Sequence, residues 1–247
     1  MLPLLIIIPL ILAIVIYMLS FKEGKQVCDN YILIAYLYAL FYICLTAYIT
    51  MMIFLNLRHM LNNLFTEDYV YIVIVVVILI AYIGLYLLTI MLPKKFVVLK
   101  HALSLLVILL GSILLAIIFF TYAPDAIFVA LIMTIVLFVV LTIITWKFQD
   151  YISSKIGIVF AITFILLIVI EIILLVFFPN SIFTSIIIFL VLLAICYLLL
   201  VKTKKLIENS KTCKEDYPPD YVSEGLGLYL SFKNLLLQIL QLRSRRR

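Results

Sequence analysis

The sequence predicts an all-α protein whose helices cross a membrane as a polytopic helix bundle. Hydrophobic residues make up 68% of the 247 residues, charged residues only 12%, and the mean hydropathy is +1.37. A soluble domain is about a quarter charged, and a molecule of this size cannot hide so many apolar side chains from water. The apolar runs are also long and unbroken, whereas the strands of a membrane barrel alternate apolar and polar residues.

The apolar runs set the expected helices, because a span needs about 20 apolar residues. They are Leu2–Leu19, Tyr31–Leu57, Tyr69–Leu92, Phe96–Tyr122, Ala126–Trp146, Ile156–Phe178 and Ile182–Val201. Leu226–Leu242 is a weaker further candidate that carries several polar residues, which is typical of a helix shielded by protein. Leu2–Leu19 lacks the basic start and cleavage site of a secretory leader, so we expect a signal-anchor helix or an additional span. We therefore divide the chain into a hydrophobic N-terminal segment with a short link, residues 1–30, and a transmembrane domain, residues 31–247.

Basic residues collect in alternate short loops, which predicts the orientation of the chain. Lysines follow the third, fifth and seventh runs, and the links at 123–125 and 179–181 contain none. The positive-inside rule therefore places the basic loops in the cytosol, and by alternation segment 21–30 with them. A single crossing by Leu226–Leu242 would separate the lysines at 202–214 from the arginine tail, so this segment either dips in and returns or crosses.

The arginine tail has several interpretations, all of them at a membrane surface. Its bases are Arg243, Arg245, Arg246 and Arg247. They are expected to bind anionic lipid headgroups, to anchor the topology, or to form a di-arginine retention signal. The basic residues of the chain as a whole lie in short clusters between apolar runs, so we expect the lipid bilayer and no nucleic acid as a partner.

Few residues are candidates for chemistry. Glu171 is a lone acid in the middle of a span, where insertion costs about 2.5–3.5 kcal/mol. It is either a cation-pathway or gating residue, paired with Lys233, or a neutral carboxyl hydrogen-bonded inside the bundle. The cysteines at 28, 44, 196 and 213 form no closely spaced pair and have no neighbouring histidine, so the sequence indicates neither a disulfide nor a metal site. Hydrolase, zinc-protease and phosphate-loop motifs are missing, so we expect no enzyme and no cofactor.

A motif near the C-terminus resembles the Bax-inhibitor or lifeguard family. Pro218–Val222, followed by Leu226–Ser231, is similar to that family's Pro-Glu-Glu-Tyr-Ile turn and Leu-Asn-Leu-Tyr-Leu-Asp helix start. Ala130–Thr134 and Lys205–Ile207 are similar to two further family stretches. The likeness covers roughly residues 93–242. It implies a seven-helix core with the last helix surrounded by the other six, to which Leu2–Leu19 would add an extra N-terminal helix.

The resemblance also implies a function in the endoplasmic reticulum or Golgi. Family members are associated with calcium leak and with suppression of cell death, which makes calcium ions and apoptosis-regulating membrane proteins the expected partners. Their pH sensor is a pair of buried aspartates, and at these positions the present chain has Thr203 and Ser231. Hydroxyls do not titrate near physiological pH, so we expect the fold without the di-aspartyl switch. The alternative is a non-conducting membrane adaptor that acts through protein–protein contacts, and an unrelated small-solute transporter is a third interpretation.

Overall fold

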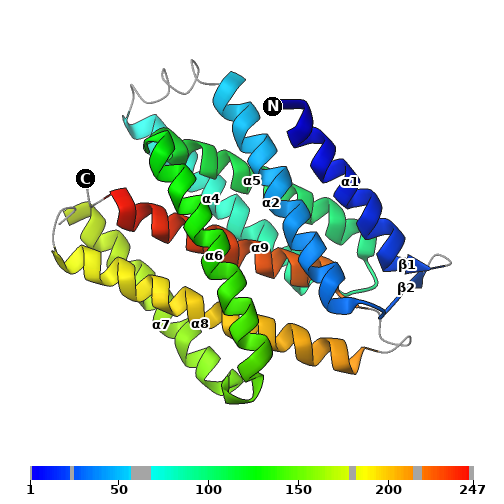
Figure 1. The fold of residues 1–247 in the computed structure, drawn as a ribbon. Coiled ribbons are helices and arrows are strands. Elements are labelled where there is room, and N and C mark those ends of the chain that lie inside the picture. The colour runs from blue at the N-terminus through cyan, green and yellow to red at the C-terminus, as the bar shows by residue number, and fades with distance from the viewer. Residues whose placement is uncertain (1, 23–24, 57–67, 178–181, 214–218, 245–247) are drawn as a thin grey trace. The chain divides into compact units, whose positions relative to one another are not determined.

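The computed structural model describes residues 2–22, 25–56, 68–177, 182–213 and 219–244, and in these ranges the chain is almost entirely helical (Figure 1). The helices are α1 (Leu2–Ser20), α2 (Tyr31–Asn56), α4 (Asp68–Met91), α5 (Val97–Phe120), α6 (Pro124–Phe148), α7 (Ser154–Phe177), α8 (Ile182–Thr212) and α9 (Tyr221–Ser244). A short hairpin of β1 (Phe21–Lys22) and β2 (Lys25–Gln26) follows α1, and a 3₁₀ turn, η1 (Gln149–Tyr151), follows α6. The predicted all-α helical membrane bundle is confirmed.

Two helices differ from the predicted runs. α8 continues eleven residues past the apolar run that ended at Val201, to Thr212, because lysine and glutamate are good helix formers although they are not apolar. One turn apart in this extension, Nζ of Lys204 lies 3.6 Å from Oε1 of Glu208. α9 begins at Tyr221 and stays uninterrupted to Ser244, so the chain does not reverse inside 226–242 as the dip-and-return alternative requires. Its 24 residues extend about 36 Å, enough to cross a bilayer.

Long apolar helices and exposed apolar side chains mark the protein as an integral membrane protein. Among the described residues, five helices (α2, α4, α5, α6 and α8) are long and apolar enough to span a bilayer. Large apolar side chains such as Val98 and Ile182 are 83% and 78% exposed. Such surfaces are stable in lipid and costly in water.

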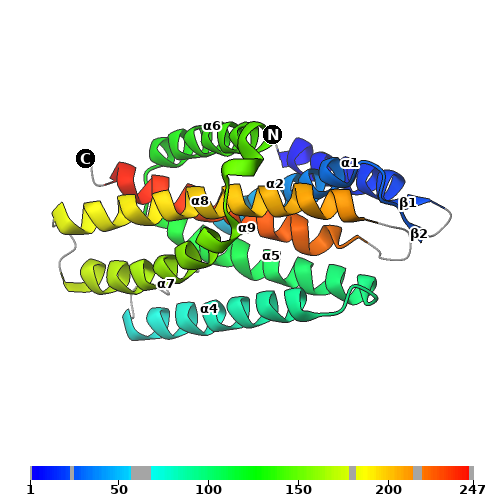
Figure 2. The same ribbon diagram turned by 90° about the horizontal axis from the view of Figure 1, so that it is seen from below.

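The chain divides into two compact units, each built from more than one stretch of sequence. Unit 1 consists of residues 1–121 and 212–229, and unit 2 of residues 122–211 and 230–247. In unit 1, α2 packs against α1 and α5, and α5 packs against α4 (Figures 1 and 2). The helix α5 forms the centre of this unit, since 56% of its apolar stretch is buried, against 6% for that of α4.

Unit 2 is held together by packing among α6, α7, α8 and the second part of α9. α7 and α8 lie side by side (Figure 2), with the rings of Phe160 and Tyr197 stacked 4.2 Å apart. Gly157 of α7 allows this approach, because a Cβ at that position would lie 2.9 Å from a methyl of Val201. Phe138 of α6 packs its ring edge-to-face at 5.7 Å from Phe232 of α9.

Among the described helices, α9 has the largest share of buried residues, although it carries many polar ones. Its first part contributes Tyr221, Leu226 and Tyr229 to the interior of unit 1. Its second part contributes Leu235 and Leu240 to the interior of unit 2. The expectation that this segment is shielded by protein is therefore confirmed.

Candidate functional site

A buried carboxylate lies in the interior of unit 2. Glu171, in the middle of α7, is 4% exposed. The side-chain amide of Gln238 on α9 donates to it, with Nε2 at 3.2 Å from Oε2 and 3.4 Å from Oε1. A carboxylate on a membrane helix is costly unless polar groups surround it, and this amide is one such group. The sequence predicted the acid, but it did not identify Gln238 as a partner.

Oxygen atoms with no hydrogen-bond donor are also buried in unit 2. In the described part of the chain, Oγ1 of Thr203, Oε1 of Gln238 and Oε1 of Gln241 are buried and accept no hydrogen bond. Buried polar atoms are normally paired, because an unpaired one loses its hydration without compensation. The unpaired amide oxygen of Gln238 belongs to the side chain that binds Glu171, so one carboxylate and one neutral oxygen lie together on α7 and α9 of unit 2. Thr203 lies toward the other end of α7, where Gly157 approaches Val201. Hard cations such as Ca²⁺ prefer oxygen ligands.

Four polar residues in the second part of α9 lie along one face of the helix. Ser231, Asn234, Gln238 and Gln241 are spaced three, four and three residues apart, which brings them onto one side of a 3.6-residue helix. The other residues of its second part are mostly hydrophobic, such as Leu235 and Leu240, but include Lys233 and Arg243. A polar stripe of this kind can be read from the sequence once the helix boundaries are known.

The two residues at the family's aspartate positions are both buried, in unit 2. Thr203 is fully buried and Ser231 is 5% exposed. They are not hydrogen-bonded to each other, because the hydroxyl of Thr203 has no hydrogen-bond partner in the described chain. That the two hydroxyls replace the aspartate pair as neutral groups stays a prediction. Lys233 is also buried, at 7% exposure, and its pairing with Glu171 stays a prediction.

A second polar cluster, which the sequence reasoning missed, surrounds the start of α9 in unit 1. The ammonium of Lys100 on α5 lies 2.5 Å from Oδ2 of Asp220 and 3.0 Å from Oγ of Ser223. Asp220 also accepts a hydrogen bond from the backbone N–H of Ser223 at 3.3 Å and so caps α9. Lys100, which the charge pattern groups with the loop bases, is 2% exposed inside α5. Because Lys94 and Lys95 lie in the loop just before it, the sequence did not indicate that Lys100 forms a buried ion pair.

The first turns of α9 also pack closely on α2. Gly225 leaves no room for a side chain, since a Cβ there would overlap Cβ of Tyr38 and lie 3.2 Å from the carbonyl oxygen of Ala35. Further along the same pair of helices, Thr46 donates a hydrogen bond of 2.9 Å to the hydroxyl of Tyr229. Both contacts lie inside unit 1, so the start of α9 is fixed there at several points.

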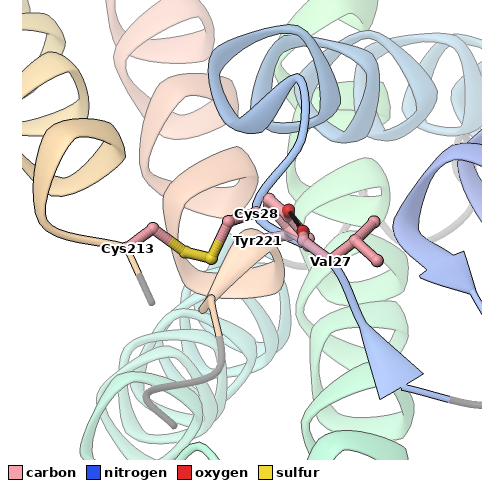
Figure 3. The surroundings of a disulfide bond; sticks show 4 residues. All are labelled: Val27, Cys28, Cys213 and Tyr221. Atoms are coloured by element: carbon pink, nitrogen blue, oxygen red, sulfur yellow. Dashed lines mark hydrogen bonds between the residues drawn. A yellow bond between two sulfur atoms is a disulfide. The ribbon is translucent and has the colours of Figure 1, made fainter. Parts of the chain in front are cut away.

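A disulfide joins two segments of unit 1 that are far apart in sequence, Cys28 and Cys213 (Figure 3). The prediction of no disulfide is therefore wrong. Sequence separation concealed the pair, because Cys28 lies just before α2 and Cys213 directly after α8, and the fold brings these two links together with their Cα atoms 5.8 Å apart. Beside it, the hydroxyl of Tyr221 donates a hydrogen bond to the carbonyl oxygen of Val27 (Figure 3). A bridge of this kind requires both segments to lie on one side of the membrane, as the basic residues predict.

Other expectations can be placed only in part. Arg243 is half-buried at the end of α9, and Arg245, Arg246 and Arg247 lie outside the described residues. Among the residues that the structure describes, no group of three or more His, Cys, Asp or Glu side chains comes together. A cavity of about 210 Å³ lies between α1, α2 and α5 in unit 1, and its polar lining includes Tyr38, His101 and Ser104.

The fold and the buried polar helix α9 define a class, the polytopic helical membrane proteins with a polar final helix. Within that class, residues 28–247 match the family described as "Inhibitor of apoptosis-promoting Bax1", and the chain belongs to this family. The match covers unit 2 and the part of unit 1 from residue 28 onward, and it leaves out all of α1 and the hairpin. No curated protein and no solved structure matches the chain significantly.

Proposed function

We propose that the protein lets calcium ions leak across an endomembrane, that of the endoplasmic reticulum or Golgi, and thereby restrains cell death. It does so without catalysing a reaction, and its partners are the bilayer, calcium ions and apoptosis-regulating membrane proteins. The observation that carries the proposal is the buried Glu171 carboxylate in contact with Gln238. Family membership supports the same function.

The arrangement of oxygen atoms favours passage of a cation over storage. A stable Ca²⁺ site offers 6–8 oxygen ligands and usually several carboxylates. Here a single carboxylate, Glu171, has the neutral amide oxygen of Gln238 beside it. Conduction requires binding strong enough to admit an ion and weak enough to release it. One charge with one neutral ligand is suited to weak, reversible binding.

The test is calcium efflux from liposomes that contain the purified protein and a calcium dye. We expect a leak above that of empty vesicles, reduced about tenfold by Glu171→Gln, because a cation loses the charge of this buried ligand. The matched control is Glu208→Gln, which removes the same charge from a carboxylate that is 52% exposed on α8. It should leave the leak unchanged.

The liposome experiment also separates the two candidate functions. A non-conducting membrane adaptor is favoured by the loss of both family aspartates, at Thr203 and Ser231. Protein that is folded in the vesicles but leaks no faster than empty vesicles would refute the calcium proposal and favour the adaptor. Coupling between Glu171→Gln and Lys233→Met in a double-mutant cycle tests the predicted pair, and additive effects would exclude it.

A pH experiment tests the lost di-aspartyl switch. The double substitution Thr203→Asp/Ser231→Asp places two carboxylates at buried positions that match the family's aspartates, and we expect them to share a proton as that pair does. We expect it to add a pH response of the leak between pH 6 and 8 that the unsubstituted protein lacks. The matched control Thr203→Asn/Ser231→Asn has the same size and no titratable group, and it should add none. A steep pH response of the unsubstituted protein would contradict the expectation.

A further inference from the structure

The disulfide Cys28–Cys213 lies where the sequence predicts a reducing compartment. Its two cysteines belong to the link before α2 and to the start of the link after α8, both assigned to the cytosol by the basic residues around them. Glutathione and thioredoxin keep most cytosolic thiols reduced, and disulfides that do form there are usually transient and redox-sensing. Both cysteines are partly exposed, so a reductant can reach the bridge.

The bridge adjoins the contacts that hold the start of α9. Val27, the neighbour of Cys28, accepts the hydrogen bond from Tyr221 in the first turn of α9 (Figure 3). The ring of Tyr221 packs 5.1 Å from Tyr31 and 6.3 Å from Tyr38 on α2. Cys213 precedes Tyr221 in the chain by eight positions. In the oxidised protein the bridge therefore holds the segment of Val27, whose carbonyl oxygen accepts the hydrogen bond from the first side chain of α9.

We propose that Cys28–Cys213 is a reversible redox clamp on the start of α9, closed when oxidised and released when reduced. The clamped segment and the segment that carries Gln238 and Gln241 are consecutive parts of one uninterrupted helix, α9. Release of the clamp lets the first turns of α9 loosen and raises the leak. The rise in the leak rests on the proposed function, whereas the loosening of α9 does not.

The chemical step is thiol–disulfide exchange with a dithiol reductant of the thioredoxin class. One thiolate of the reductant attacks one protein sulfur, and the other protein sulfur leaves as a thiolate and takes up a proton. The second thiol of the reductant then displaces the first protein sulfur, which is protonated in turn. The protein gains two electrons and two protons as Cys28 and Cys213 thiols, and the reductant becomes a disulfide.

The experiment measures the clamp and the leak separately, with dithiothreitol as the reductant. Hydrogen exchange of peptides from the first two turns of α9, followed by mass spectrometry in lipid nanodiscs, reports the clamp. We expect reduction to speed this exchange at least tenfold and reoxidation to reverse it. In liposomes, reduction should raise the calcium leak several-fold. The variant Cys28→Ser/Cys213→Ser should give the exchange rate and the leak of the reduced protein, and dithiothreitol should change neither.

The control removes the other two cysteines. Cys44→Ser/Cys196→Ser leaves the bridge intact, since these cysteines are free thiols in α2 and α8, and it should respond to dithiothreitol as the unsubstituted protein does. Unchanged exchange in α9 after reduction would overturn the clamp, as would a response of Cys28→Ser/Cys213→Ser to dithiothreitol. If reduction changes hydrogen exchange in α9 but neither the oxidised nor the reduced protein leaks calcium, the proposed function is refuted and the clamp is supported. If reduction changes hydrogen exchange in α9 but leaves the calcium leak unchanged, the clamp does not control the leak.

Discussion

The buried pair of Lys100 and Asp220 gives a prediction whose size can be worked from the structure. Asp220→Asn removes the carboxylate charge and keeps the helix cap, because asparagine caps helices as well as aspartate does. The ammonium of Lys100, 2% exposed, is then left with Ser223 and no counter-charge. Breaking a fully buried ion pair on one side costs about 3–5 kcal/mol. Asp220 is 18% exposed, so water already weakens the pair, and we take the lower end, about 3 kcal/mol.

The reverse substitution should cost less. In Lys100→Met the remaining carboxylate of Asp220 is partly hydrated, keeps its hydrogen bond from the N–H of Ser223, and sits at a helix N-terminus that favours negative charge. We expect a loss of about 1 kcal/mol. The double variant Lys100→Met/Asp220→Asn contains no unpaired charge, so it should be more stable than Asp220→Asn alone by about 2 kcal/mol.

The assay is reversible unfolding of the purified protein in mixed micelles by titration with sodium dodecyl sulfate, followed by circular dichroism. The free energy of unfolding should fall in the order unsubstituted protein, Lys100→Met, Asp220→Asn. If Asp220→Asn is as stable as Lys100→Met, or if the double variant is less stable than both, the lysine does not depend on this carboxylate. The reasoning from burial would then be refuted.

Two further predictions concern the packing of α9 and α2. Gly225→Ala should destabilise the protein by about 1–3 kcal/mol, because the new Cβ would overlap Cβ of Tyr38. The matched control Gly84→Ala has nothing within 4 Å of its new Cβ and should be neutral or stabilising by about 0.5–1 kcal/mol; equal losses at both glycines would contradict the packing argument. The buried hydrogen bond from Thr46 to Tyr229 should give a coupling of about 0.5–1.5 kcal/mol in a cycle of Thr46→Val and Tyr229→Phe, and no coupling would show that the bond contributes nothing.

The apolar runs of the sequence predicted the boundaries of most helices closely. The boundaries of α2, α4, α5, α6 and α7 differ from the predicted runs by two residues or fewer at each end. The hydropathy criterion failed at Lys202–Thr212 and at Tyr221–Gly225, where helical sequence is polar. Hydropathy measures transfer to lipid, whereas helix formation depends on backbone hydrogen bonds that a lysine makes as well as a leucine.

The sequence by itself determined the class of the protein, because its surplus of apolar side chains leaves lipid as the solvent for the outer surface. It also determined the family, through the order of short motifs around Asp220 and Ser231, and it singled out Glu171 as the isolated acid of a span. Only the tertiary structure decided the partners: Gln238 for Glu171, Asp220 for Lys100, and Cys213 for Cys28. The physical reason is that a pattern of residues fixes which groups must leave water, while hydrogen bonds, ion pairs and disulfides form within a few ångströms and depend on how distant segments meet.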